Sequence, residues 1–211
     1  MLRAALFDLD GVVLDTEDQY TGFWKEQGLL YYPDIKDFAQ RIKGMTLTQV
    51  FEQYFATDTQ AQKQIVDALN AFEADMHYEY ISGFERFVIG LSKQNVLTAV
   101  VTSSNLQKMS NVYRSRPELK NHFDAILTSE DFRRSKPDPD CYLEAARRFG
   151  LRPDECMGFE DSINGLRALR SAPMFTVALA TTNPRDVVSK YADLVIDDFT
   201  QTSPEQALEL I

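Results

Sequence analysis

Short apolar runs recur along the chain, and several of them stop abruptly at polar residues. The first run, residues 4–7 (Ala-Ala-Leu-Phe), is continuously apolar, which is typical of a parallel strand buried on both faces. Similar runs lie in the second half of the chain, at 97–101, 125–127, 155–159, 175–179 and 194–196. The segments between them are expected to be helical, at 84–94, 105–114, 140–149 and 163–170, just after Pro184 and at the end of the chain. This alternation predicts a parallel sheet with crossover helices.

Residues 17–80 interrupt the alternation, because no run there indicates a buried strand. Helices are expected instead at 17–27, 35–43, 47–55 and 61–80, separated by Gly28, Pro33 and Gly44. In the last of them one face carries apolar residues at helical spacing, which is most simply core packing: Ile65, Leu69, Phe72 and Met76. The predicted fold is α/β, a doubly wound parallel sheet formed by residues 1–15 and 81–211, with residues 16–80 as an inserted helical domain.

Composition and charge narrow the possible partners. The chain has 211 residues, of which 44% are hydrophobic, enough for the core of one domain with a modest insertion. The net charge of −10 argues against nucleic acid, because binding it needs a basic face. The first apolar run stops at Asp8, too early for a signal peptide, and no apolar stretch is long enough to span a membrane. We therefore expect a cytoplasmic monomer with no membrane partner.

Several common kinds of site lack the residues they need. Cys141 and Cys156 form no Cys-x-x-Cys motif; one disulfide is formally possible, but we expect two reduced thiols. The chain has two histidines, His77 and His122, so it offers few of the residues that a zinc site or a Ser-His-Asp triad needs. Neither Gly-x-Gly-x-x-Gly nor Gly-x-x-x-x-Gly-Lys occurs, so neither a dinucleotide-binding fold nor a P-loop is supported.

The first strand is followed directly by acidic residues that are candidates for catalysis and metal binding. Residues 8–16 are Asp-Leu-Asp-Gly-Val-Val-Leu-Asp-Thr, and Asp8 and Asp10 would lie at the carboxyl end of the strand, where open α/β sheets bind ligands. Gly11 allows the chain to leave the strand sharply. Two neighbouring carboxylates need a cation or a proton, and a hard divalent ion such as Mg²⁺ is the natural partner.

Three later segments place polar residues beside predicted strands. Thr102 and Ser103 follow the strand at 97–101; such residues bind phosphate oxygens, although by themselves they are more often simple helix caps. Lys136 lies in a loop stiffened by two prolines. Glu160 and Asp161 form a second acidic pair after the strand at 155–159.

These four segments, in this order, resemble the four motifs of the haloacid dehalogenase superfamily, in its branch of β-phosphoglucomutase-like phosphatases with a helical cap domain. The resemblance implies that Asp8 is a nucleophile that accepts a phosphoryl group and that Asp10 is a general acid and base. It implies that Thr102 and Ser103 bind phosphate and that Lys136 neutralises its charge. The implied Mg²⁺ ligands are drawn from both acidic pairs: Asp8, Asp10, Glu160 and Asp161. Residues 16–80 would then be a cap domain that closes over the site and selects the substrate.

The implied function is Mg²⁺-dependent hydrolysis of a small phosphorylated metabolite, a sugar phosphate by family analogy, through an aspartyl-phosphate. An anionic aspartate that attacks an anionic phosphate meets repulsion of roughly 4 kcal/mol for unit charges about 4 Å apart at an effective dielectric near 20. Lys136 and Mg²⁺ are therefore required by this chemistry.

A sugar phosphomutase is the second function that the resemblance allows. Lys43, Gly44 and Trp24 match the cap domain of β-phosphoglucomutase, and Thr16 and Tyr20 are further candidates for the substrate site. Two positions depart from it, because Tyr20 stands where that enzyme has a histidine and Leu47 where it has an arginine that binds the distal phosphate. Leucine cannot bind phosphate, and Lys43 would replace the arginine only in part, so we expect hydrolysis.

Three more classes of protein fit the sequence less well. A receiver-type signalling domain must keep its phosphate, so Asp10 beside the nucleophile and the inserted helices argue against it. Dehalogenases of the family need no metal and lack the second aspartate of the first motif. A catalytically inactive binding module is not expected to retain the residues of all four motifs.

Overall fold

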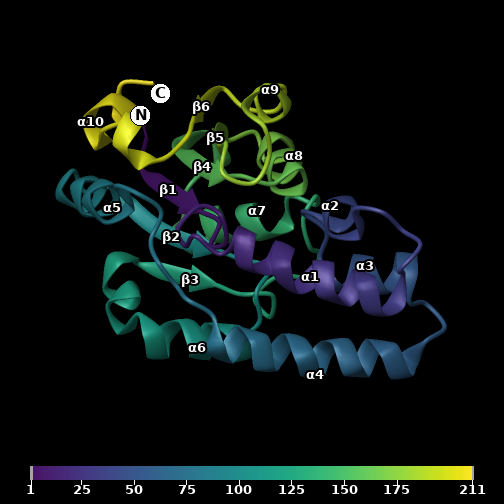
Figure 1. The fold of residues 1–211 in the computed structure, drawn as a ribbon. Coiled ribbons are helices and arrows are strands. Elements are labelled where there is room, and N and C mark those ends of the chain that lie inside the picture. Colours follow the sequence, from purple (N-terminus) through teal and green to yellow (C-terminus); the bar gives the residue numbers. More distant parts are fainter. Residues whose placement is uncertain (1, 211) are drawn as a thin grey trace.

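The structure, a computed structural model that describes residues 2–210, contains a parallel sheet of six strands in the order β3-β2-β1-β4-β5-β6 (Figure 1). The expected doubly wound α/β fold is thus confirmed. The strands begin and end within a residue of the predicted positions: β1 Ala4–Phe7, β2 Leu97–Val101, β3 Ala125–Leu127, β4 Cys156–Glu160, β5 Phe175–Leu179 and β6 Leu194–Ile196. Because β1 pairs with both β2 and β4, the first strand lies in the middle of the sheet.

Helices cover both faces of this sheet, as expected for crossover connections (Figure 1). They are α5 Phe84–Lys93, α6 Leu106–Ser115, α7 Asp140–Arg148, α8 Ile163–Ser171, α9 Arg185–Val188 and α10 Pro204–Leu208. Three 3₁₀ helices, which the apolar pattern does not predict, lie at Pro117–His122, Pro153–Glu155 and Phe199–Gln201. These are short turns at connections, where periodicity carries little signal.

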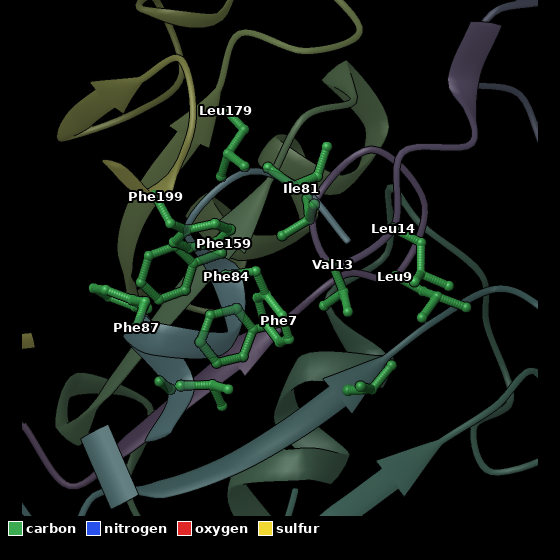
Figure 2. Close-up of a cluster of buried hydrophobic side chains, with 14 of the residues drawn as sticks. Phe7, Leu9, Val13, Leu14, Ile81, Phe84, Phe87, Phe159, Leu179 and Phe199 are labelled. Atoms are coloured by element: carbon green, nitrogen blue, oxygen red, sulfur yellow. The ribbon is translucent and has the colours of Figure 1, made fainter. Parts of the chain in front are cut away.

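The two faces of the sheet have separate hydrophobic cores, because successive strand residues point to opposite sides. Phe7 belongs to the larger core, where Phe84, Phe87, Phe159 and Phe199 surround it (Figure 2). Its ring stacks on that of Phe159 with centroids 4.5 Å apart. Leu6, the residue before it, lies in the core on the opposite face. The continuous apolar run of β1 is therefore used on both sides.

The segment between β1 and α5 forms four helices, α1 Glu17–Tyr31, α2 Phe38–Ile42, α3 Leu47–Tyr54 and α4 Thr59–Asp75. These helices share a small hydrophobic cluster, distinct from the two cores of the sheet: Phe38, Ile42, Val50, Phe55, Ala61 and Ile65. The chain enters and leaves through two segments that lie side by side, since Asp15 N–H donates to Glu79 O at 2.8 Å and Ile81 N–H donates to Val13 O at 3.0 Å. The division into a core domain and a cap domain stays a prediction.

The helix boundaries in this segment that differ most from the expected ones are the ends of α1 and α4. Helix α1 continues through Gly28 to Tyr31, because Gly28 serves close packing there instead of ending the helix. A Cβ at Gly28 would lie only 2.8 Å from Cβ of Phe38. Helix α4 ends at Asp75, because Met76 takes an extended backbone conformation and its side chain packs into the larger core, which contains Phe7.

Two further expectations concern the cysteines and membranes. Cys141 and Cys156 are both buried and free, in agreement with the expected reduced thiols. Burial raises the pKa of the Cys141 thiol to about 12 and that of Cys156 to about 11. No helix within residues 2–210 combines the length and the hydropathy that crossing a bilayer requires.

Two glycines are expected to respond to alanine in opposite directions. Gly158 lies in β4, and a Cβ there would overlap the side chain of Leu169, so Gly158→Ala should lower the free energy of unfolding by about 1–3 kcal/mol. Gly22 lies inside α1, where a Cβ meets no other atom of the described residues within 4 Å. Gly22→Ala should raise the unfolding free energy by up to about 1 kcal/mol through helix propensity. Urea titration of both variants measures the two changes, and equal destabilisation would contradict this account.

Candidate active site

The carboxyl ends of three neighbouring strands bring the predicted residues to one edge of the sheet. Asp8 directly follows β1, Thr102 follows β2, and Glu160 and Asp161 stand at the end of β4. Since β1 lies between β2 and β4, these side chains converge although they are far apart in the sequence. Asp8, Thr102 and Asp161 line a cavity of about 450 Å³ whose opposite wall comes from α1, α4 and residues 42–48, whereas Glu160 is completely buried and does not line it.

Lys136 links the first acidic residue to the second acidic pair. Its Nζ lies 2.6 Å from Oδ1 of Asp8 and 2.6 Å from Oε1 of Glu160, and it also donates to Val101 O at 3.0 Å. Glu160 is completely buried and accepts a further bond at 2.8 Å from the Tyr142 hydroxyl. Burial by itself would lower the pKa of Lys136, but the charges of Asp8 and Glu160 outweigh it and raise the pKa. Lys136 is thus held as a cation at the end of β1.

The acidic residues at this edge are not neutralised by Lys136 alone. Burial raises the pKa of Asp8 to about 7, although Lys136 opposes the rise. Burial also raises the pKa of Asp161 well above its usual range, with Glu160 adding to the effect. Asp161 accepts a hydrogen bond from the Thr182 hydroxyl, which offsets only part of this. Carboxylates in such surroundings gain stability from a bound cation.

Three carboxylates are arranged so that one cation could contact all of them. One oxygen each of Asp8, Glu160 and Asp161 lie within 4.8 Å of one another. An all-oxygen set with few carboxylates fits Mg²⁺, which keeps several waters. These residues could therefore hold the ion that the sequence predicts.

The carboxylate of Asp10 lies outside this group and faces different partners. Its Oδ1 accepts from the Thr16 hydroxyl at 2.6 Å, and its Oδ2 accepts from Ser104 Oγ at 3.2 Å and Lys108 Nζ at 2.5 Å. Gly11, with φ of +75°, turns the chain directly after Asp10, and a Cβ there would overlap Asp161. Asp10 lines the cavity, and both roles predicted for it, metal ligand and general acid and base, stay predictions.

The remaining predicted residues lie around the same cavity. Thr102 is buried, and its hydroxyl accepts from Ser104 N–H at 3.0 Å; Thr102 and Ser103 both line the cavity. Lys43, Gly44 and Tyr20 lie on the opposite wall. Gly44 O on that wall accepts a hydrogen bond from Asn164 Nδ2 at 2.8 Å.

The structure adds residues that the sequence motifs do not indicate. Lys108 on α6 and Glu73 on α4 both line the cavity and are both buried. Thr182 lies in the loop after β5 and bonds Asp161. Ser104 had a usable signal, since it continues the Thr-Ser-Ser run after β2, but Lys108 and Glu73 lie inside ordinary helical sequence. Only the packing of α4 against α6 brings these two to the site.

Comparison with known proteins agrees with this geometry. The family described as haloacid dehalogenase-like hydrolase matches residues 5–179. A β-phosphoglucomutase of Bacillus subtilis is 29% identical, over 100% of this chain and 94% of that protein. Hexitol phosphatase B of Escherichia coli K12 is 25% identical, over 98% and 97%. The crystal structure of a family IA, variant 3 HAD hydrolase from Entamoeba histolytica superimposes with a TM-score of 0.86 at 23% identity and covers 99% of both chains.

Proposed function

The chain belongs to the haloacid dehalogenase-like hydrolase family, and from this premise we propose that it is a phosphatase of small phosphorylated metabolites that works through an aspartyl-phosphate on Asp8. The observation that carries the proposal is the position of Asp8. It stands at the end of the central strand, 2.6 Å from the ammonium of Lys136, in a group of three carboxylates able to share one cation. A carboxylate so placed can attack a phosphate that Lys136 helps to bind.

The proposed reaction has two steps. A carboxylate oxygen of Asp8 attacks the phosphorus, the bond from phosphorus to the alcohol oxygen breaks, and Asp10 gives that oxygen a proton. Water then attacks the phosphorus of the aspartyl-phosphate, Asp10 takes a proton from the water, and inorganic phosphate leaves as the Asp8 carboxylate is restored. Asp10 suits both roles because its carboxylate is held at the cavity by Thr16, Ser104 and Lys108.

Positive charge must balance the phosphate during both steps. Lys136 supplies one charge, and Thr102 and Ser103 line the cavity where hydroxyl and backbone N–H groups can bind the phosphate oxygens. Asp8, Glu160 and Asp161 would hold Mg²⁺, which supplies the remaining positive charge when bound.

We further propose that α1–α4 act as the cap domain. Their residues form the cavity wall opposite Asp8, and the volume of about 450 Å³ suits a small metabolite. The name of the related hexitol phosphatase supports a phosphorylated sugar or sugar alcohol as the substrate class.

Sugar phosphomutase activity is the second candidate, favoured by the 29% identity to a β-phosphoglucomutase. The cavity wall argues for hydrolysis instead. Among the described residues that line the cavity the cationic ones are Lys43, Lys108 and Lys136, and the last two bond Asp10 and Asp8 respectively. A mutase must hold a bisphosphate at both ends. Leu47 stands where β-phosphoglucomutase has the arginine that binds the distal phosphate, so Lys43 is the cation that remains on this wall for that phosphate.

The products formed from β-glucose 1-phosphate separate these two candidates. With Mg²⁺ present, we expect inorganic phosphate or no reaction, measured by a phosphate assay together with an enzymatic assay for glucose 6-phosphate. A panel of other sugar and polyol phosphates, assayed for phosphate release, tests the wider proposal. Conversion to glucose 6-phosphate without phosphate release, stimulated by glucose 1,6-bisphosphate, would identify a mutase.

A further inference from the structure

Lys108 is a buried lysine for which the proposed two-step reaction gives no direct role. It lies on α6, is 4% exposed, and donates from Nζ to Oδ2 of Asp10 at 2.5 Å. A buried ammonium loses its hydration and persists only where neighbouring groups compensate the loss. The groups around Lys108 therefore indicate what the residue does.

One set of neighbours comes from the helices of the proposed cap domain. Lys108 Nζ lies over the ring of Tyr20 on α1, 4.7 Å from its centroid. The Tyr20 hydroxyl in turn donates to Glu73 Oε1 on α4 at 2.8 Å. Glu73 is itself buried, at 7% exposure. Burial raises the pKa of Glu73, and the positive charge of Lys108 opposes that rise.

The other neighbour is the carboxylate of Asp10, which is bonded on both oxygens. Thr16 binds Oδ1, while Ser104 and Lys108 bind Oδ2. Lys108 provides the charged bond among the three, and charge-assisted hydrogen bonds are roughly twice as strong as neutral ones. Without it, one hydroxyl would remain on Oδ2, and the carboxylate could rotate away from the reacting oxygen.

We infer that Lys108 is a positioning residue that holds Asp10 for proton transfer and is itself held by Tyr20 and Glu73. The inference rests on the proposed function of Asp10. It makes the alignment of Asp10 depend on the packing of α1 and α4 against α6, because those helices carry Tyr20 and Glu73. The contact of α4 with α6 is reinforced by Arg114, whose side chain donates to Ala74 O at 3.2 Å.

The dependence on the leaving group distinguishes positioning of Asp10 from a general effect on structure. An alkyl phosphate needs its leaving oxygen protonated, whereas p-nitrophenyl phosphate has a leaving group stable as an anion and gains little from a general acid. The value of kcat/KM reports formation of the aspartyl-phosphate, the step in which the alcohol leaves. Lys108→Met should therefore lower kcat/KM for an alkyl phosphate selectively.

The experiment compares Lys108→Met with the wild type on p-nitrophenyl phosphate and on the alkyl phosphate that the wild type hydrolyses fastest. We expect kcat/KM to fall about 10–100-fold for the alkyl ester, part of the ~10²–10⁴-fold that a general acid contributes, and at most a few-fold for the aryl ester. Asp10→Asn should give the same selectivity with a larger loss. Tyr20→Phe and Glu73→Gln should show it to a smaller extent. Equal losses for both esters, or no loss, would overturn the inference.

Lys120→Met is the matched control. Lys120 also lies over a tyrosine ring, that of Tyr113 on α6, with Nζ 3.9 Å from the centroid. It is exposed and does not line the cavity. Its substitution should leave the ratio of the two kcat/KM values unchanged, and a change equal to that of Lys108→Met would count against a specific role for Lys108.

A thermal double-mutant cycle tests the pairing without any activity. If Lys108 and Asp10 act as a unit, Lys108→Met and Asp10→Asn together should change the Tm by much less or much more than the sum of the single changes. Simple additivity would overturn the pairing. If the wild type hydrolyses neither ester, the proposed function fails, and this cycle still decides whether Lys108 holds Asp10.

Discussion

Asp8→Asn is expected to lower kcat at least ~10³-fold while the protein stays folded, because an amide oxygen is a poor nucleophile and the aspartyl-phosphate cannot form on asparagine. The substitution keeps the shape of the side chain. It also removes a charge that folding disfavours, since burial raises the pKa of Asp8 from 3.8 to about 7. A carboxyl whose pKa is higher in the folded than in the unfolded protein does not lower the stability at pH values below its unfolded-state pKa. It lowers the stability most at pH values above its folded-state pKa. At pH 8 without added metal, the Tm of Asp8→Asn should thus equal or exceed that of the wild type.

The measurements are kcat with the best substrate of the phosphate-release panel, acid-quenched labelling of the phospho-enzyme, and Tm. Asp15→Asn is the matched control: Asp15 lies in the same loop, is exposed and does not line the cavity, so its activity should remain close to that of the wild type. A variant at position 8 that kept a tenth of the wild-type kcat would rule out the covalent mechanism.

Removal of divalent metal should have a comparably large effect. Excess EDTA is expected to abolish phosphate release, and added Mg²⁺ should restore it, because Lys136 alone cannot balance the buried carboxylates and the incoming phosphate. Mg²⁺ should also raise the Tm in the absence of substrate, since a ligand that binds only the folded state stabilises it. Asp8, Glu160 and Asp161, with oxygens within 4.8 Å of one another, are the expected ligands.

Asp161→Asn separates loss of this site from a general effect of chelation. We expect the variant to need a higher Mg²⁺ concentration for half-maximal activity and to show a smaller rise in Tm, whereas Asp15→Asn should titrate like the wild type. Undiminished turnover in excess EDTA would contradict the metal assignment. An unchanged Mg²⁺ titration for Asp161→Asn would remove that residue from the site.

The order of the strands and of the helices that connect them could be predicted from the sequence, because apolar runs indicate burial directly. A strand covered on both faces, such as β1, needs Leu6 on one side and Phe7 on the other, so its apolar run is unbroken. The places where these runs end locate Asp8, Thr102 and Glu160, and parallel pairing then brings them together.

The same local reasoning was wrong where glycine or helix length depends on a distant partner. Gly28 was expected to end a helix, yet it lies inside α1 because Phe38 packs against its backbone. The apolar spacing predicted a helix up to residue 80, but α4 ends at Asp75 because Met76 packs into the larger core of the sheet. A pattern within one segment contains no information about the neighbour that decides these cases.

For the site, the sequence by itself determined the acidic pairs, Lys136 and the hydroxyl residues after β2, because each stands at a strand end or in a loop with a recognisable local context. Only the tertiary structure decided what surrounds Asp10. Lys108 and Asp10 are 98 residues apart, and Tyr20 and Glu73 are 53 apart, in helices with ordinary polar and apolar spacing. Their interaction depends on how α1 and α4 pack against α6, and a buried lysine is indistinguishable in sequence from a solvated one until that packing removes the water around it.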